Sequence, residues 1–237
     1  MSAKYSLAFG LLATAGLIAA GATDRGAVRL MAGCATVAFG LLGAAYAGLG
    51  PRLLLKRPGG RRGPGAWPLY WPYFLLNELG FRLYRLTERR PPFDRVAPDL
   101  DLGRRLTASE ASRAGTPTWA AVLDLAAEFA EVGPLRRAGA YRSLPVLDAT
   151  APTPGELAAA VAWLSERVPE GPVYVHCALG HGRSATVAIA YLLATGRAET
   201  VEEGLATVRS RRPGVRLNPA QMAALREFAR APSDEGA

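Results

Sequence analysis

The chain has 237 residues, which is enough for one ordinary globular domain and an accessory segment. Half of the residues are hydrophobic, and the formal net charge at pH 7 is +8. Residues 1–50 contain only four charged side chains, at Lys4, Asp24, Arg25 and Arg29. This uneven charge excludes a chain that is exposed to water throughout, and it predicts that the first part lies in lipid and the rest in water.

Two apolar runs fill the first part of the chain. Tyr5–Thr23 and Leu30–Leu49 are each about one bilayer thickness long if helical, and the connection Asp24–Arg29 fits a helical hairpin. Small residues such as Ala15 and Gly16 let two membrane helices approach closely. We therefore predict a transmembrane helical hairpin over residues 1–50. A cleaved signal peptide in the first run and a buried soluble hairpin are the alternatives.

A basic segment follows between residues 51 and 90. It contains nine basic residues and two acidic ones, Glu78 and Glu88, which indicates an anionic membrane surface or, equally, a solubilising linker. No nucleic-acid recognition motif accompanies the charge, so nucleic acid is not an expected partner. Because Arg52–Arg62 directly follows the second apolar run, the positive-inside rule predicts a multi-pass membrane protein whose residues from 51 onward are cytoplasmic.

This basic segment has two parts. Pro58–Gly65 has the composition of a linker, and an aromatic-rich stretch follows it. Aromatic side chains with flanking arginines are typical of membrane interfaces, so we predict an interfacial helix from about Pro72 to Arg85. The alternative is a helix that packs on the globular domain.

The globular domain is expected over residues 91–231, followed by a flexible tail at 232–237. Thr153 and Pro154 mark the start of one of its helices. Alternation of strands and helices predicts an α/β fold with a mostly parallel central sheet flanked by helices. The expected strands are 120–125, 143–147 and 172–176, and the expected helices are 154–167, 184–195, 201–211 and 219–230.

A possible reactive site lies between the last of these strands and the helix that follows it. Cys177 and Arg183 are six positions apart, and Gly180 and Gly182 permit the unusual dihedral angles of a tight loop. Backbone N–H groups of such a loop can turn inward around an anion, and the helix start adds positive potential. The planar guanidinium of Arg183 can bind two oxygens of the same anion. A thiolate at Cys177 is favoured in this surrounding, so the loop is predicted to hold an oxyanion against a nucleophilic sulfur. A buried structural cysteine is the alternative.

This stretch resembles the signature of the protein tyrosine phosphatase superfamily, His-Cys-(five residues)-Arg-Ser/Thr. More narrowly it resembles the dual-specificity branch over roughly Ala140–Arg230, in a membrane-anchored bacterial form. The resemblance implies the cysteine-phosphatase fold and a phosphoric monoester hydrolase. It implies that Ser184 hydrogen-bonds the thiolate and helps it to leave, and that His176 supports the loop. The implied phosphate-binding loop is Ala178, Leu179, Gly180, His181, Gly182 and Arg183.

The resemblance also implies a general acid on a separate loop. Asp148 lies 29 residues before Cys177 and directly after a predicted strand, which suits an acid that protonates the leaving group and then activates water. A turn or cap aspartate is the alternative reading of Asp148, and Asp124 is its rival as the acid. The reaction implied in this way passes through a cysteinyl phosphate and needs no cofactor. No metal site is expected, since both histidines, His176 and His181, lie at this loop.

Four functions stay open for this chain. The first is hydrolysis of a phospholipid or other membrane-associated phosphomonoester, because a hairpin holds the site near lipid phosphates. The resemblance extends to lipid phosphatases that act on phosphatidylglycerophosphate, and His181 sits where some lipid-directed relatives carry a basic residue. The others are a protein tyrosine or dual-specificity phosphatase acting on phosphoproteins, a sulfurtransferase, and a non-catalytic membrane module that binds phosphorylated ligands. The sequence specifies no oligomeric state.

Overall fold

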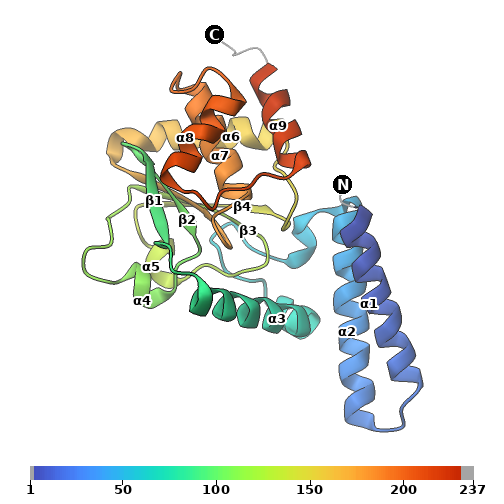
Figure 1. The fold of residues 1–237 in the computed structure, drawn as a ribbon. Helices are drawn as coiled ribbons and strands as arrows, with labels where there is room; N and C mark the ends of the chain where they lie inside the picture. Colours follow the sequence, from blue (N-terminus) through green and yellow to red (C-terminus); the bar gives the residue numbers. More distant parts are fainter. Residues whose placement is uncertain (1–2, 231–237) are drawn as a thin grey trace. The chain divides into compact units, whose positions relative to one another are not determined.

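The computed structural model describes residues 3–230, which form two compact units (Figure 1). The first unit comprises the chain up to Arg57, residues 61–89 and residues 127–130. The second comprises residues 58–60, residues 90–126 and the chain from Glu131 onward. The tail predicted at 232–237 lies outside the described residues, as does the last residue of the predicted domain.

A helical hairpin begins the first unit. Helix α1 (Ala3–Gly21) is followed by α2 (Gly26–Ala44), which continues as the π-helical turn η1 (Ala45–Leu49). Both helices are long and apolar enough to cross a membrane. Because α2 already begins at Gly26, the connection is residues 22–25 rather than the predicted Asp24–Arg29.

Small residues let α1 and α2 lie close together. A Cβ added to Gly16 would lie 2.7 Å from Thr36 Oγ1 and 3.1 Å from the carbonyl oxygen of Ala32, so only glycine fits this contact. Near the other end of the hairpin, Ser6 Oγ donates a hydrogen bond to the carbonyl of Gly43, 3.0 Å away. The face predicted from the small residues of the first run therefore does carry the helix contact.

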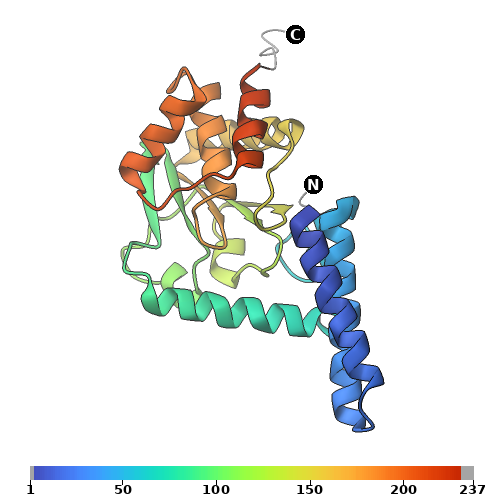
Figure 2. The same cartoon turned by 45° about the vertical axis from the view of Figure 1, so that its right-hand side comes forward.

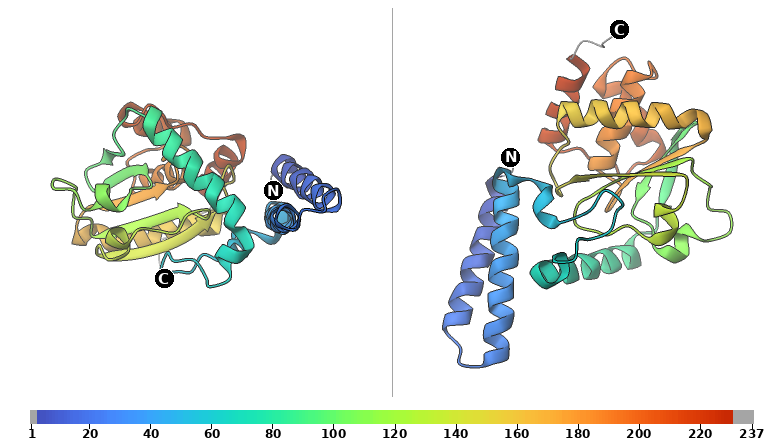
Figure 3. Two further views of the ribbon diagram at one scale, coloured as in Figure 1. Left: turned by 90° about the horizontal axis from the view of Figure 1, so that it is seen from below. Right: turned by 180° about the vertical axis from the view of Figure 1, so that it is seen from behind.

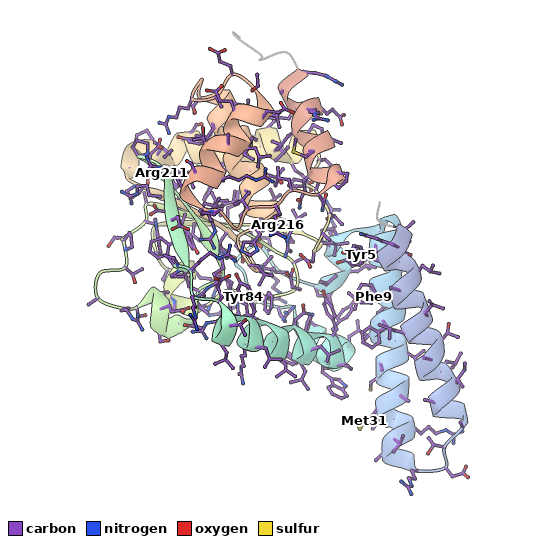
Figure 4. All side chains as sticks on the ribbon, in the orientation of Figure 1. Tyr5, Phe9, Met31, Tyr84, Arg211 and Arg216 are labelled. Atoms are coloured by element: carbon purple, nitrogen blue, oxygen red, sulfur yellow. The ribbon has the colours of Figure 1, made fainter. Side chains whose placement is uncertain are left out.

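Aromatic rings join this hairpin to the rest of the first unit. Tyr5 and Phe9, labelled in Figure 4, each have their ring centroid 5.4 Å from that of Tyr46 in η1. Phe9 also meets Tyr73 of helix α3 (Ala66–Thr87) edge to face at 6.2 Å. Aromatic pairs at these separations stabilise their contacts beyond simple burial.

The segment between the hairpin and α3 is ordered by backbone hydrogen bonds. It begins with the 3-10 turn η2 (Pro51–Leu54), after which Lys56 pairs with Arg62 in an isolated antiparallel bridge. The backbone of Gly63 also donates to Leu55 O at 2.7 Å. The stretch predicted as a linker from its proline and glycine content is therefore a closed turn in this part of the chain.

Helix α3 is longer than the interfacial helix predicted at 72–85, because it starts six residues earlier and ends two residues later. Pro68 lies in its first turn, where a backbone N–H makes no helical hydrogen bond, so this proline does not prevent the helix from starting at Ala66. Pro72 lies inside the helix rather than at its start. One side of α3 packs within the first unit through Tyr70, Phe74 and Phe81.

A five-stranded sheet is the frame of the second unit. Its order is β1-β2-β5-β3-β4, with β1 antiparallel to β2 and the other neighbours parallel. The predicted mostly parallel sheet is confirmed. The strands are β1 (Phe93–Ala97), β2 (Leu100–Arg104), β3 (Ala121–Ala126), β4 (Ala140–Val146) and β5 (Val173–Cys177).

Helices cover both faces of this sheet. Figures 2 and 3 show α6 (Pro154–Arg167), α7 (Arg183–Ala194), α8 (Val201–Arg211) and α9 (Pro219–Arg230) on one face, and α4 (Ala108–Ala111) and α5 (Gly133–Arg136) on the other. The 3-10 turn η3 (Val168–Glu170) follows α6. The helices predicted at 154–167, 201–211 and 219–230 have the same bounds in the structure, and the fourth starts one residue earlier than predicted.

The main core lies between the sheet and the larger helix layer. Strand β5 is buried along its whole length, and so is α7 from Arg183 to Leu192. A strand buried on both faces is what a central position in a parallel sheet requires. The core therefore fixes the end of β5 and the start of α7, the two points that the loop between them joins.

Two strands, β1 and β2, were not predicted, and a third, β4, was predicted too short. In β2, Asp101 is 1% exposed and accepts hydrogen bonds from Arg95 Nε at 2.9 Å and Trp119 Nε1 at 2.8 Å. Arg95 lies opposite Asp101 on β1, and Trp119 lies 18 residues further along the chain, so the apolar pattern of residues 100–104 alone does not mark the strand. Similarly, β4 starts three residues earlier than predicted, because its first residues are only half-buried at the sheet edge.

Replacing Gly16 with leucine is expected to separate α1 from α2. The added side chain would overlap Thr36 and the Ala32 carbonyl, which the helix contact cannot accommodate without shifting. The separation is measured as a several-fold slower oxidative cross-linking between cysteines introduced on the two helices of the full chain.

Suitable positions for those cysteines are Ser6 and Gly43, in a chain whose two native cysteines are replaced by serine. Gly10→Leu is the matched control, since nothing lies within 4 Å of a Cβ at that position. Equal cross-linking rates in the two leucine variants would contradict the close contact.

Candidate active site

The loop between β5 and α7 carries the candidate nucleophile. Cys177 ends β5 and is 3% exposed, so the sheet places its sulfur at the bottom of the loop. The backbone N–H of Gly180 donates to Cys177 Sγ at 3.3 Å, and Ser184 Oγ lies 3.3 Å from the same sulfur. The loop thus directs hydrogen-bond donors at the sulfur, which is the arrangement expected of an anion-binding nest.

The two loop glycines serve different purposes. Gly180 has a φ of +73°, and a Cβ there would lie 2.4 Å from the carbonyl carbon of Gly103, so an L side chain is excluded. Gly182 has φ −116° and ψ −80°, outside the regular helical and extended regions, which agrees with the unusual dihedrals predicted for the loop. Space is also short there, because a Cβ would lie 2.9 Å from the side-chain nitrogen of Gln221.

Arg183 is the first residue of α7 and is 2% exposed. Its Nη1 donates to the carbonyl oxygen of Val146 at 2.8 Å, and its Nη2 lies 2.9 Å from Asp148 Oδ1. The guanidinium is therefore held in one orientation at the end of β4. A planar donor group fixed in this way is suited to bind two oxygens of one oxyanion.

A cavity of about 200 Å³ opens over this loop. It brings together Cys177, Arg183 and Asp148, which are the predicted nucleophile, oxyanion-binding arginine and acid, although Asp148 precedes Cys177 by 29 residues in sequence. The Asp148 side chain is 69% exposed, so it is open to solvent at the cavity. The cavity is lined by Asp148, Ala149, Cys177, Leu179, His181, Gly182, Arg183, Arg216, Asn218 and Gln221.

The pKa of the Cys177 thiol lies below its ordinary value. Burial acts against this, since it raises the pKa by disfavouring the charged thiolate. The positive charge of Arg183 and the hydrogen bonds from Ser184 and from the Gly180 N–H outweigh burial. The thiolate, which is the nucleophilic form, is therefore more easily formed here than in an ordinary cysteine.

His176 precedes the nucleophile and is fully buried. Its Nε2 lies 2.8 Å from Glu131 Oε2, and its Nδ1 lies 3.3 Å from the carbonyl oxygen of Cys177. The ring also stacks on Tyr174 at 5.2 Å. These contacts fix the position of the imidazole beside the loop, and they identify Glu131 as a partner that the sequence did not reveal.

Asp124, the rival acid, lies in the interior on β3. It is 1% exposed, and it accepts hydrogen bonds from the Tyr141 hydroxyl at 2.7 Å and from the Ala126 N–H at 2.9 Å. It does not line the cavity over Cys177. This position favours Asp148 as the residue that can reach a leaving group.

The same Asp124 belongs to a buried group that sequence inspection did not anticipate. Its carboxylate, Glu131 and His176 have ligand atoms that all lie within 4.8 Å of one another, the kind of cluster that can hold a metal ion. Each of the three already has a close protein partner in this structure. The group therefore has a structural explanation as a buried hydrogen-bonded network beneath the loop.

Arg212, which sequence analysis missed, braces the loop from behind. Its side chain is 3% exposed, and its Nε donates to the carbonyl oxygen of Gly180 at 2.9 Å. Its Nη1 lies 2.6 Å from Asp94 Oδ2. Arg212 therefore binds the backbone of the same residue whose N–H donates to Cys177 Sγ, and it anchors that residue to β1 through Asp94.

Asn218 and Gln221 connect this region to the loop of the predicted acid. Asn218 Nδ2 donates to the Ala149 carbonyl at 2.9 Å, and Gln221 Nε2 donates to the Thr150 carbonyl at 3.0 Å. The two residues also cap each other through reciprocal side-chain to backbone bonds at 3.0 and 2.9 Å. The start of α9 is therefore tied to the loop that follows β4.

Residues 138–231 match a family model described as the dual specificity phosphatase catalytic domain. A stretch of 57 residues is 46% identical to the phosphatidylglycerophosphate phosphatase PTPMT2 of Arabidopsis thaliana. That alignment covers 24% of this chain and 25% of the length of the relative.

Solved structures resemble the second unit in fold. The crystal structure of Tk-PTP in the active form matches with a TM-score of 0.52 and 28% identity, over 59% of this chain and 97% of that one. The crystal structure of PTPMT1 in complex with PI(5)P matches with a TM-score of 0.51 and 22% identity, over 59% and 95%. At 22% identity, the likeness to PTPMT1 concerns the fold alone.

Changing Ser184 to alanine is expected to raise the pKa of the Cys177 thiol, because a hydrogen bond to the thiolate is lost. The thiolate is the reactive form and exists above the pKa, so alkylation of Cys177 slows at neutral pH and its pH midpoint moves upward. The midpoint is measured with iodoacetamide in a Cys34→Ser chain. Ser165→Ala, at an exposed site on α6, is the control, and an unchanged midpoint in Ser184→Ala would contradict the assignment.

Proposed function

We propose that this chain, whose residues 138–231 belong to the dual-specificity phosphatase family, hydrolyses phosphate monoesters with Cys177 as the nucleophile. The observation that carries the proposal is a low-pKa thiol that shares one cavity with a fixed guanidinium and a solvent-accessible carboxyl group. A site of this kind binds an oxyanion and supplies an attacking sulfur without further groups.

In the first step, Cys177 Sγ attacks phosphorus and the ester P–O bond breaks. The loop N–H groups and Arg183 hold the charge on the phosphoryl oxygens. Because Asp148 pairs with Arg183 in this structure, the phosphate takes over the guanidinium as it binds and releases the carboxyl group. The released carboxylate of Asp148, open to solvent, takes up a proton from water and passes it to the departing oxygen, which leaves as the alcohol.

In the second step, water attacks the cysteinyl phosphate and the P–S bond breaks. Asp148, now deprotonated, accepts the proton of that water, and inorganic phosphate leaves. Ser184 Oγ, 3.3 Å from the sulfur, donates its hydrogen bond to the thiolate as it departs. His176 supports the loop through its contacts with Glu131 and the Cys177 carbonyl.

For the substrate, we propose a phosphomonoester on a phospholipid head group. The relative PTPMT2 is named a phosphatidylglycerophosphate phosphatase, and the shared stretch is 46% identical. The two apolar N-terminal helices support the same class, since a membrane-held enzyme meets lipid phosphates at high local concentration. A phosphoprotein substrate is the second candidate, supported by the dual-specificity family model.

We further propose that the first unit attaches the chain to a membrane, with the catalytic unit on the cytoplasmic side. The basic tract that directly follows η1 supports this orientation. Helix α3 exposes an apolar face of Trp67, Leu75, Leu76, Leu79, Leu83 and Leu86, each more than half exposed. An exposed apolar face on the helix that follows the apolar hairpin in the chain supports the interfacial position predicted for this helix.

Cys177→Ser is expected to reduce phosphate release to background, because the hydroxyl group of serine is not ionised at neutral pH. Asp148→Asn is expected to lower kcat by about 100-fold to 10,000-fold on alkyl phosphates, which need a proton on the leaving oxygen. The loss should be smaller on aryl phosphates, whose phenolate leaves more easily. Release is measured with the full chain in detergent, with chelator present.

Glu166→Gln, an exposed carboxyl on α6, is the control for the loss of one negative charge. Turnover that survives in Cys177→Ser would sink the nucleophile assignment. An equal loss for alkyl and aryl phosphates in Asp148→Asn would leave the residue without a role as the acid.

An environment-sensitive fluorophore at Leu83→Cys, in a chain without its native cysteines, is expected to shift to the blue when the protein is placed in anionic vesicles. The reason is that this side of α3 lies against lipid in the proposed arrangement. The same fluorophore at Glu166→Cys should keep its spectrum in water. Matching spectra at the two positions would show that α3 does not lie in the interface.

A further inference from the structure

The loop that carries Asp148 contains a strained backbone position. Leu147–Thr150 form a tight turn, in which the Thr150 N–H and hydroxyl donate to the Leu147 carbonyl at 3.2 and 2.8 Å. Ala149, the third residue of this turn, has a φ of +56°. Turns with a positive φ at this position normally place glycine or asparagine there, because a Cβ is crowded by the backbone. An alanine therefore keeps this conformation only where other contacts hold it.

Side-chain amides at the start of α9 supply such contacts. Asn218 Nδ2 donates to the Ala149 carbonyl at 2.9 Å, and Gln221 Nε2 donates to the Thr150 carbonyl at 3.0 Å. The amide oxygens are used within α9, since Asn218 Oδ1 accepts from the Gln221 N–H and Gln221 Oε1 accepts from the Asn218 N–H. Each amide thus binds the helix start through its oxygen and the turn through its nitrogen.

Gln221 also sets the turn against the phosphate-binding loop. The residue is 2% exposed. A Cβ added to Gly182 would lie 2.9 Å from its Nε2 and 3.0 Å from its Oε1, so the amide lies directly against that loop. One buried amide therefore contacts both the turn of the acid and the loop between Cys177 and Arg183.

The turn matters most when a substrate is bound. The Asp148 side chain is 69% exposed, and it pairs with Arg183 at 2.9 Å. In the proposed function, the phosphate takes over that guanidinium, so this ion pair is lost when the acid is needed. The direction of the carboxyl group then depends on the backbone that carries it, and a small misplacement of a catalytic group slows its step strongly.

We propose that Asn218 and Gln221 are positioning residues for the acid. By donating to the Ala149 and Thr150 carbonyls, they hold the strained turn and thereby direct Asp148 at the leaving oxygen. This inference rests on the proposed function and adds two residues to its acid step.

Asn218→Asp tests the role of the donor, because aspartate keeps an oxygen that caps α9 and lacks the N–H that reaches Ala149. The variant is expected to lower kcat on benzyl phosphate by about 10-fold to 100-fold, with KM within about threefold. Hydrolysis of p-nitrophenyl phosphate should stay within about threefold, since nitrophenolate leaves without a proton. Gln221→Glu should give the same split. Phosphate release is measured with the full chain in detergent, with chelator present.

Ala220→Asp is the matched control. Ala220 is exposed in the first turn of α9 and does not line the cavity, so the substitution adds a carboxylate in the same turn and leaves both amides in place. Its rates on both esters should equal those of the wild type.

A glycine substitution in the turn gives a second test, which does not depend on how well Asn218→Asp folds in the wild-type background. Ala149→Gly removes the strain, so the turn depends less on the Asn218 donor. Within an Ala149→Gly chain, Asn218→Asp is expected to lower kcat on benzyl phosphate by at most about threefold. A loss as large as in the wild-type background would show that Asn218 does not act through this turn.

An equal fall for the two esters in Asn218→Asp and Gln221→Glu, or the same split in Ala220→Asp, would overturn the positioning role. If the wild type hydrolysed the aryl ester and not the alkyl ester, the acid step and this inference would both be wrong, and Cys177 would remain the nucleophile. Absence of hydrolysis of either ester by the wild type would contradict the proposed function itself.

Discussion

The candidate site depends on keeping a negative sulfur stable in a place that is almost without water. Burial of Cys177 disfavours its thiolate, so the charge exists only because donors are fixed around it. Arg183 supplies the opposite charge, and Ser184 and the Gly180 N–H supply hydrogen bonds. The same donors are those that a phosphate needs, so the elements that stabilise the nucleophile also bind the group it attacks.

Those donors stay in place because the second unit holds the loop from three sides. The core fixes β5 and α7, which set the two ends of the loop. Glu131 orients His176, which precedes the loop, and Arg212 donates a hydrogen bond to the Gly180 carbonyl within the loop. The segment that contains Arg212 continues to Gln221, which ties it to the loop of Asp148. Loop and acid are thereby positioned by one continuous stretch of chain.

The first unit has a different physical basis, because its surface suits lipid. Leu7, Leu17 and Ile18 on α1 are 65, 63 and 66% exposed, which water would disfavour over a continuous face. Helices α1 and α2 satisfy their backbone hydrogen bonds internally, as a bilayer requires. The two helices also contact each other closely at Gly16. In the proposed function, the covalent connection of this unit to the catalytic unit raises the local concentration of lipid phosphates at the site.

The sequence by itself determined the features that depend on neighbouring residues. These are the apolar helices, the strand-loop-helix around Cys177 and Arg183, and the alternation that predicts a parallel sheet. Features whose partners lie far apart in the chain follow only from the folded structure. Buried Asp101 of β2 is satisfied by Trp119, 18 residues away, and Glu131 and Arg212 support a loop many residues away. Hydrophobic periodicity reports which side chains avoid water, but a buried polar side chain is stable only beside its partner, and that partner is fixed by folding.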